Sequence, residues 1–279
     1  MSFGEFLQSI GLLVDHPRLD GAIHRCPTRT KPRKKNGAYQ FFGTHGWGQA
    51  HDEHLYPVIW RDDGQIRFEP RAPAPPQVDM AARLGELKQQ RAAAAQRARA
   101  IIGECTTGTH PYFGLKGFPA EQGLIDPQGF LVIPMRRFLR YESIVSVQWI
   151  DDEGAKKFLP GGAAKGACYV IGSQKAHTSW FVEGYIDGLT LRAALRKLYR
   201  DDNVVVCFSA GNLIHVAELA GEGFVFADND ASMTGQRAAE ATGLKWTMSP
   251  STGNDVNDDM LAHGLDYVVD HLRRFLSSV

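Results

Sequence analysis

The residues best suited to chemistry are carboxylates that follow short apolar runs in the C-terminal third of this 279-residue chain. Glu183 ends one run and Asp187 follows within the next turn. Asp228 and Asp230 end a later run, and Asp255 follows the last one. In an extended backbone residues i and i+2 point the same way, so Asp228 and Asp230 can face one ion. Carboxylate oxygens are hard ligands that suit Mg²⁺ or Mn²⁺ far better than zinc.

Packing these five carboxylates together is unfavourable unless a cation neutralises them. The electrostatic cost therefore predicts a divalent metal site with ligands among Glu183, Asp187, Asp228, Asp230 and Asp255. A single Asp after a strand is common as a helix N-cap, so Asp230 or Asp255 taken alone would be structural more often than not. The ordered set EGYID, DND and GNDVND is much less expected by chance.

The elements that must position these acids can be read from four short apolar runs, SWFVEG, NVVVCFS, GFVFAD and LKWTMS. Each run predicts a strand, and helical segments are expected near 188–200, 211–220, 232–242 and 257–275. Strands that alternate with helices predict a parallel, right-handed α/β sheet. In such sheets ligands bind beyond the carboxyl ends of the strands, which is where the acids lie.

Shifts in composition divide the chain into four parts, at 1–70, 71–103, 104–177 and 178–279. In the first part, residues 1–70, the sequence predicts a short amphipathic helix followed by short strands and turns. The second begins with the Pro-rich stretch RAPAPP, a predicted linker, and continues as an Ala-rich helix from an Asp79 N-cap to about Ile102. The third predicts a small antiparallel β region.

The segments EGYIDGLTL, FADNDASMTGQRAA and GNDVND resemble the Toprim signature of bacterial primases. Upstream, THPYFGLKGF, VIPMRR, SVQWIDDEGAKKFLPGG and CFSAGNLIHVA resemble the primase segment of phage and plasmid primases, and DGAIHRCPTRTKPRKKNGAYQFF resembles their N-terminal module. The resemblance implies a Toprim parallel sheet flanked by helices. A small α+β subdomain and an N-terminal α+β module would precede it.

The same resemblance implies roles for the acids. Glu183 would be the general base or a metal ligand, Asp228 and Asp230 would hold Mg²⁺ (or Mn²⁺), and Asp187 and Asp255 would be accessory acids. In such sites metal ions polarise the α-phosphate during nucleotidyl transfer. Two positions depart from the pattern, because asparagines 229 and 257 stand where the family carries a small residue and an acid.

Basic residues just ahead of the acidic segment are candidates for phosphate contacts, because related primases guide template and nucleotide through a basic groove there. The candidates are Arg136, Arg137, Lys156, Lys157 and Lys165. We favour Lys157 and Lys165, which lie beside the Gly-rich FLPGGAAKG segment. Lys116 is a weaker candidate. The alternative is that these residues are solubilising surface charges.

A basic run near the N-terminus fits the binding of single-stranded DNA, since charge can track the backbone while aromatic rings stack on bases. Its main members are Lys31, Arg33, Lys34 and Lys35, flanked by Tyr39, Phe41, Phe42 and Trp47. A solvated loop is the alternative. No structural zinc is expected, because the spacing of nearby His and Cys residues matches no ribbon or finger.

Composition narrows the setting. The formal net charge is zero, which by itself says nothing for or against binding of nucleic acid. The four cysteines form no CxxC pair, and a disulfide framework is not expected in a chain of this length, so a reducing cytoplasm is expected. The N-terminus does not read as a signal peptide, and no stretch is apolar enough for a membrane span. The chain carries no GxxxxGK[ST] motif, so a helicase partner would be a separate polypeptide.

The resemblance to Toprim primases implies a primase that makes short RNA primers on single-stranded DNA from NTPs and a divalent metal. A Toprim-type nuclease using the same acids is one alternative. A non-catalytic nucleic-acid-binding protein with a vestigial site is another.

Overall fold

The computed structural model describes residues 1–54, 57–62, 80–173 and 176–278. They form two compact units, Met1–Arg83 and Leu84–Val279. The RAPAPP stretch and Asp79 lie outside the described residues. No helix in the described ranges combines the length and the apolar composition that a membrane crossing needs.

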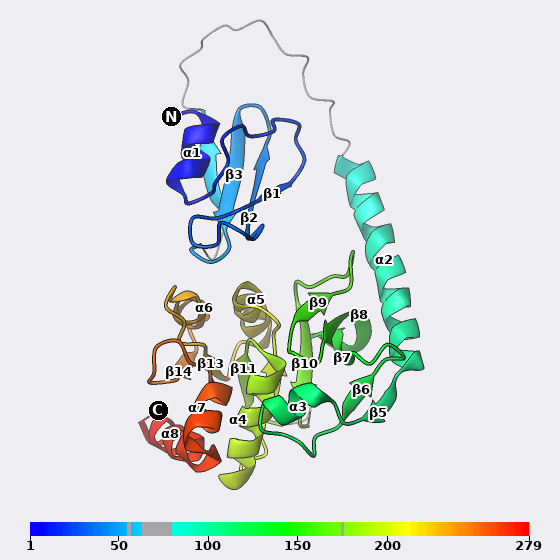
Figure 1. The fold of residues 1–279 in the computed structure, drawn as a ribbon, viewed down its shortest axis with the longest axis vertical. Coiled ribbons are helices and arrows are strands. Elements are labelled where there is room, and N and C mark those ends of the chain that lie inside the picture. Colours follow the sequence, from blue (N-terminus) through cyan, green and yellow to red (C-terminus); the bar gives the residue numbers. More distant parts are fainter. Residues whose placement is uncertain (55–56, 63–79, 174–175, 279) are drawn as a thin grey trace, which may run out of the picture. The chain divides into compact units, whose positions relative to one another are not determined.

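The first unit is a small α+β module (Figure 1). Helix α1 (Phe3–Ser9) begins with a capping box in which the side chains of Ser2 and Glu5 each accept the other's backbone amide. It buries Phe3 and Phe6 against a four-stranded antiparallel sheet. The strands, in spatial order, are β1 (His24–Cys26), β2 (Gly37–Phe41), β3 (His45–Ala50) and β4 (Val58–Arg61).

The second unit is built on one ten-stranded sheet with the order β14-β13-β11-β12-β10-β7-β6-β5, while β8 pairs with β7 and β9 with β8. Its first half holds β5 (Thr106–Gly108), β6 (Gly123–Ile125), β7 (Leu131–Arg137), β8 (Arg140–Ile150), β9 (Lys156–Phe158) and β10 (Ala167–Ile171). These strands pair antiparallel. Helix α2 (Met80–Glu104) packs on them through Ala94 and Ala98, and α3 (Pro111–Leu115) follows β5.

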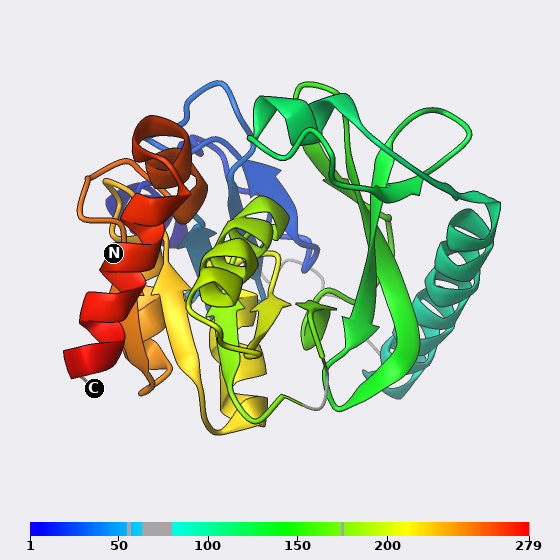
Figure 2. The ribbon, with the colours of Figure 1, turned by 90° about the horizontal axis from the view of Figure 1, so that it is seen from below.

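The other half confirms the predicted parallel sheet. Its strands are β11 (Ser179–Val182), β12 (Asn203–Val206), β13 (Phe224–Ala227) and β14 (Lys245–Met248), all parallel to one another. Their alternating side chains face two different helix layers, so both sides of β11, β12 and β13 are largely buried, while the edge strand β14 is partly exposed. Figures 1 and 2 show α4 (Tyr185–Lys197), α7 (Val256–His263) and α8 (Leu265–Ser278) on one face, and α5 (Ala210–Ala220) and α6 (Thr234–Ala241) on the other.

Helix boundaries differ from the predicted ones in ways that matter for the site. Helix α4 begins at Tyr185, three residues early, so Asp187 lies in its first turn. The single helix predicted over 257–275 is two helices, because Gly264 ends α7 with a φ of +85° that favours glycine. Helix α2 continues past its predicted end at about Ile102 to Glu104.

Strand direction brings two regions to one edge. Strand β10 pairs antiparallel with β12 and β7 antiparallel with β10. The end of β7 and the start of β10 therefore lie at the same edge as the carboxyl ends of the parallel strands.

Candidate active site

The predicted acids gather at the carboxyl edge of the parallel strands. Glu183 directly follows β11 and Asp228 directly follows β13, while Asp187 lies in the first turn of α4. Asp230 lies before α6 and Asp255 caps α7. Each of the five influences the ionisation of at least one other member. We call this set the acidic cluster.

Burial and mutual repulsion make three of these acids hard to ionise. Burial raises the pKa of Glu183 to about 7, and the charge of Asp187 adds to the rise. Burial raises the pKa of Asp228 to about 8, with further repulsion from Glu183. The pKa of Asp187 lies well above its ordinary value because the side chain is buried and faces Asp255 and Asp228. The cluster thus has more negative groups than its surroundings neutralise.

Two glycines of the motifs make room for these carboxylates. A Cβ on Gly184 would lie 2.2 Å from Oδ2 of Asp187, so only glycine leaves that carboxylate where it is. A Cβ on Gly235 would lie 2.3 Å from the backbone oxygen of Asp228, which allows α6 to start against the end of β13. Both glycines therefore position acids rather than simply permit turns.

Asp230 and Asp255 also act as helix caps. The carboxylate of Asp230 accepts hydrogen bonds from the amides of Thr234 and Gly235 at the start of α6. Burial would raise the pKa of Asp230, but these bonds and one from the Ser232 hydroxyl outweigh it and lower the pKa. Asp255 accepts the amide of Asp258 at 2.8 Å. Their capping roles coexist with their place in the cluster.

The two asparagines that depart from the family pattern hold the edge together. Asn229 donates from Nδ2 to the carbonyl of Ser249 at 2.8 Å, which ties the end of β13 to the end of β14. Asn257 is fully buried and donates from Nδ2 to Lys116 O and to Thr190 Oγ1, both at 3.0 Å. Its position joins α7 to α4 and to the end of α3.

The acidic cluster suits a divalent cation in donor type and charge. Oδ1 of Asp187 is buried without a hydrogen-bond partner, and so is Oδ1 of Asn257. Across the part of the chain that the structure describes, however, no three His, Cys, Asp or Glu side chains are placed so that they could hold an ion as they stand. The carboxylates lie near one another, and side-chain rotation would have to bring them onto one cation.

The basic residues predicted upstream separate into different surroundings. Nζ of Lys156 lies 3.8 Å from the place where a Cβ on Gly184 would be, so Lys156 reaches the acidic cluster. Lys157 is the next residue on β9, and neighbouring residues of a strand face opposite sides. The structure thus brings Lys156, and not the favoured Lys157, to the acids.

Arg137 and Lys165 line a second feature, a hollow of about 410 Å³ at the same sheet edge, which we call the basic hollow. Its other charged or polar lining residues are Arg140 and His215. Asn212 on α5 fixes the loop beneath, since its side chain accepts the Gly166 amide and donates to Ala167 O, both at 2.7 Å. Two strands separate β7 from β11, so the hollow lies beside the acids rather than among them.

Arg136 is already engaged. It donates to the Tyr141 carbonyl at 3.2 Å, and its guanidinium lies 5.4 Å from the centre of the Tyr141 ring. These contacts leave Arg137 as the freer of the two predicted arginines to meet a phosphate.

The N-terminal module places one of its aromatic rings, that of buried Tyr39, beside its basic run. Lys31, Arg33, Lys34 and Lys35 are exposed in the connection between β1 and β2. Tyr39 and Phe41 pack in the module's core, and Trp47 is half-buried. Phe42 is exposed, but it lies beyond the far end of β2. Lys35 and Tyr39 share a hollow of about 410 Å³ with His16, Arg18, His24 and Arg25.

Comparison with known proteins gives a sequence match to a DNA primase. A scan against models of known families finds none that fits. Over 235 residues the chain is 27% identical to DNA primase TraC of Escherichia coli, in an alignment that covers 77% of this chain and 21% of TraC. The chain thus spans about a fifth of the length of that relative. The match confirms the resemblance to DNA primases that the motifs indicate.

Two solved structures show partial backbone likeness. The primase fragment of the bacteriophage T7 primase-helicase protein has a TM-score of 0.43 and 16% identity, covering 61% of this chain and 77% of that chain. A DNA primase domain from Pseudomonas aeruginosa has a TM-score of 0.37 and 15% identity, covering 65% and 58%.

Sequence reasoning missed two basic side chains of this edge, Arg140 and His215, and gave Lys116 only as a weaker candidate. Arg140 and His215 reach the basic hollow from β8 and α5, which are distant in sequence from Lys165. Lys116 lies close enough to Asp187 to oppose the rise in its pKa. The carbonyl contact from Asn257 to Lys116 could not be expected from spacing, because 141 positions separate them.

Proposed function

We propose that this chain is a DNA primase that synthesises short RNA primers on single-stranded DNA by metal-dependent nucleotidyl transfer. The observation that carries the proposal is the acidic cluster: the EGYID, DND and GND segments meet at one sheet edge in a chain similar to TraC. Its substrates would be NTPs and its template single-stranded DNA. A separate helicase and a cytoplasmic setting belong to the same proposal.

Glu183 is suited to accept the proton of the attacking 3′-hydroxyl. A general base works best when its pKa lies near the operating pH, and burial raises the pKa of Glu183 to about 7. The residue ends a strand whose position is fixed on both sides by neighbouring strands. Its carboxylate can therefore be held at one place relative to the reacting atoms.

Asp187, Asp228, Asp230 and Asp255 are the proposed holders of Mg²⁺ or Mn²⁺, with Glu183 as a further ligand. A bound divalent ion would stabilise the charge that develops on the α-phosphate. Gly184 and Gly235 keep space for Asp187 and for the turn after Asp228, and the amides of α6 hold Asp230 ionised.

The phosphate-binding part of the proposal uses Arg137 and Lys165 in the basic hollow, with Arg136 and Lys157 as further candidates. Lining by two guanidinium groups, an ammonium and an imidazole suits a nucleic-acid backbone. In the N-terminal module, Lys31, Arg33, Lys34 and Lys35 are the proposed contacts to template, with contributions from charge rather than from ring stacking.

The test is direct synthesis. Purified chain is incubated with labelled NTPs, single-stranded DNA of mixed sequence, and Mg²⁺ or Mn²⁺, and the products are resolved by length. We expect short labelled RNAs that require template and disappear with a chelator. Metal-dependent shortening of a labelled template, without new RNA, would assign the site to a nuclease instead. Binding of DNA with neither reaction would indicate a non-catalytic protein.

A further inference from the structure

Two lysines from the antiparallel half of the sheet flank the acidic cluster. Nζ of Lys156 lies 3.8 Å from the place of a Cβ on Gly184, directly after Glu183. Lys116 follows α3, and its carbonyl accepts the buried amide of Asn257 at 3.0 Å. Both ammonium groups oppose the rise in the pKa of Asp187. The cluster thus has a cationic side that the parallel strands do not supply.

The orientation of Lys156 follows from the short strand β9. Lys156 and Phe158 point to one side and Lys157 to the other. The ring of Phe158 packs edge to face on Phe208, with 6.2 Å between their centres. Phe208 follows β12, and its amide donates to the carbonyl of Glu183 at 2.8 Å. The face of β9 that carries Lys156 is therefore attached to the carboxyl edge.

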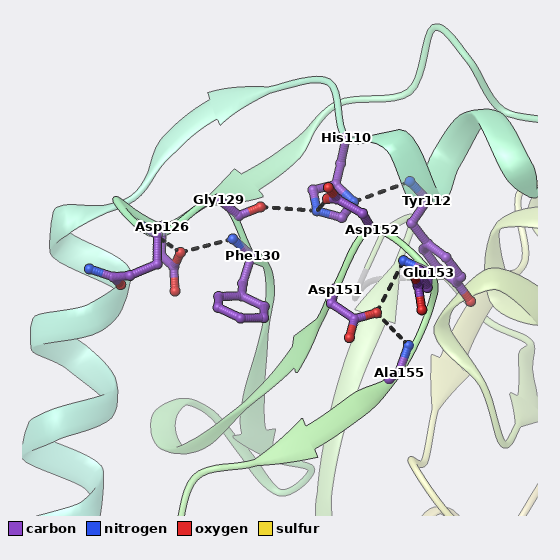
Figure 3. Close-up of polar contacts among 10 residues, drawn as sticks. His110, Tyr112, Asp126, Gly129, Phe130, Asp151, Asp152, Glu153 and Ala155 are labelled. Carbon is purple, nitrogen blue, oxygen red and sulfur yellow. Dashed lines mark hydrogen bonds and ion pairs between the residues drawn. The ribbon is translucent and has the colours of Figure 1, made fainter.

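The hairpin that carries Lys156 is held in place by hydrogen bonds within its own turn and by His110. Figure 3 shows the carboxylate of Asp151 accepting the amides of Glu153 and Ala155, which closes the turn between β8 and β9. Buried His110 accepts the Tyr112 amide at Nδ1, so its proton lies on Nε2. Nε2 faces the Gly129 carbonyl at 3.0 Å and Asp152 at 3.3 Å (Figure 3).

Lys156 lies close to the acids but is not paired with any one of them. Within the described ranges, neither Lys156 nor Lys116 forms an ion pair with an acid at 4.0 Å or less. The side chain of Lys156 is also exposed. Its three ammonium hydrogens remain available to a ligand that brings negative charge to the edge of the cluster. A phosphate group that also meets a cation on the acids would be such a ligand.

We propose that Lys156 binds the polyphosphate of a nucleoside triphosphate at the acidic cluster. The inference rests on the proposed function and refines it, since the position of Lys157 beside the Gly-rich segment made Lys157, and not Lys156, the favoured phosphate contact in the sequence. Lys156 is a binding residue for the substrate, and the β8–β9 hairpin positions it. The basic hollow, two strands away, is left to the nucleic-acid backbone.

Titration of the full chain with inorganic tripolyphosphate in the presence of Mg²⁺, followed by calorimetry, tests the proposal without any reaction. Lys156→Gln should weaken binding about tenfold or more, the effect of one charge-assisted hydrogen bond. Lys88→Gln, on the exposed surface of α2, is the matched control, and it should change affinity less than about twofold because it removes the same charge outside both the acidic cluster and the basic hollow. Lys156→Arg should retain most of the affinity.

Two further titrations separate the explanations. Mg²⁺ alone should bind Lys156→Gln at least as tightly as wild type, because the change removes a positive charge; weaker metal binding would mean a damaged site and would overturn the proposal. A single-stranded oligonucleotide should bind wild type and Lys156→Gln with equal affinity. Equal tripolyphosphate affinity in Lys156→Gln and Lys88→Gln, no binding by wild type, or loss of oligonucleotide affinity instead, would each refute the proposal. If tripolyphosphate binding depends on Lys156 but the chain makes no primers, the phosphate-binding site is supported and the primase function is rejected.

Discussion

The acidic cluster and the basic run of the N-terminal module are both concentrations of like charge, but the fold treats them differently. At the acidic cluster three carboxylates have defined places: Gly184 leaves space for Asp187, Asp230 accepts the first amides of α6, and Asp255 caps α7. The side chains of Lys31, Arg33, Lys34 and Lys35 are exposed in one connection. Burial raises acid pKa values in the first region, whereas the second is solvated.

The difference indicates two kinds of recognition. A buried cluster of acids gains from a cation at a fixed position, which is what a reaction needs. An exposed set of cations gains from any polyanion that approaches, which suits affinity without sequence preference. Chemistry is therefore expected at the sheet edge and attraction of template at the module.

The largest expected effect is on the reaction itself. Glu183→Gln should reduce primer synthesis by roughly 10²- to 10⁴-fold, the usual contribution of a general base, while leaving the fold intact. Glu222→Gln, which changes an exposed carboxylate outside the cluster, is the control and should keep full activity. Wild-type primer yield from Glu183→Gln, at equal circular dichroism, would show that Glu183 is not catalytic.

The next effect is on stability and concerns two glycines, each the second residue of its helix: Gly235 of α6 and Gly211 of α5. Gly235→Ala places a Cβ 2.3 Å from the backbone oxygen of Asp228, so it should destabilise the chain by about 1–3 kcal/mol and lower primer yield. Gly211→Ala, at the equivalent position of α5, meets nothing within 4 Å and should be neutral or stabilising by up to about 1 kcal/mol. Thermal unfolding of both variants checks this, and equal midpoints would contradict the packing account.

The basic run should act through salt. Replacing Lys31, Arg33, Lys34 and Lys35 by Ala should weaken binding of single-stranded DNA and reduce the slope of log affinity against log salt by up to about 3, since each contact contributes roughly 0.7. Mg²⁺ binding at the acidic cluster should not change. The control replaces an equal number of exposed basic residues on α4 and α8: Arg196, Lys197, Arg273 and Arg274. If the slope of log affinity against log salt is the same in both variants, the basic run is only a solvated loop.

The smallest effect separates Asp228 from Asp230 in metal-free buffer. The native pKa of Asp228 is about 8, so between pH 4 and 8 the native state holds a proton that the unfolded chain releases, and stability falls as pH rises. Asp228→Asn removes that loss and should raise the unfolding midpoint by a few degrees near pH 8, given roughly 2–4 °C per kcal/mol. Asp230→Asn should lower it slightly, because an anion at the start of α6 is replaced.

This contrast between the two aspartates also shows where sequence reasoning stops. The apolar runs and the acids at their ends predict the parallel sheet and the edge at which Glu183 and Asp228 meet. The i, i+2 spacing treats Asp228 and Asp230 as equivalent. Whether a carboxylate is repelled by neighbours or held by amides depends on where α6 begins, and α6 begins at Thr234 after a left-handed Met233.

The basic side of the edge was the least predictable. In Lys156-Lys157-Phe158 all three side chains are exposed, so no apolar alternation indicates which lysine faces the acids. The packing of Phe158 on Phe208 decides it, and that contact joins residues fifty positions apart. Arg140 and His215 reach the basic hollow for a similar reason, since strand and helix packing bring them to Lys165.

The central claim, that acids from separate strand ends form one cation site, is tested most directly by titrating the full chain with Mn²⁺ and following free ion by paramagnetic resonance. Asp228→Asn and Glu183→Gln should each weaken the same site by about tenfold or more, as expected when a charged ligand is lost. Glu222→Gln should bind as wild type does. Unchanged Mn²⁺ affinity in both cluster variants would place the ligands elsewhere and contradict the account.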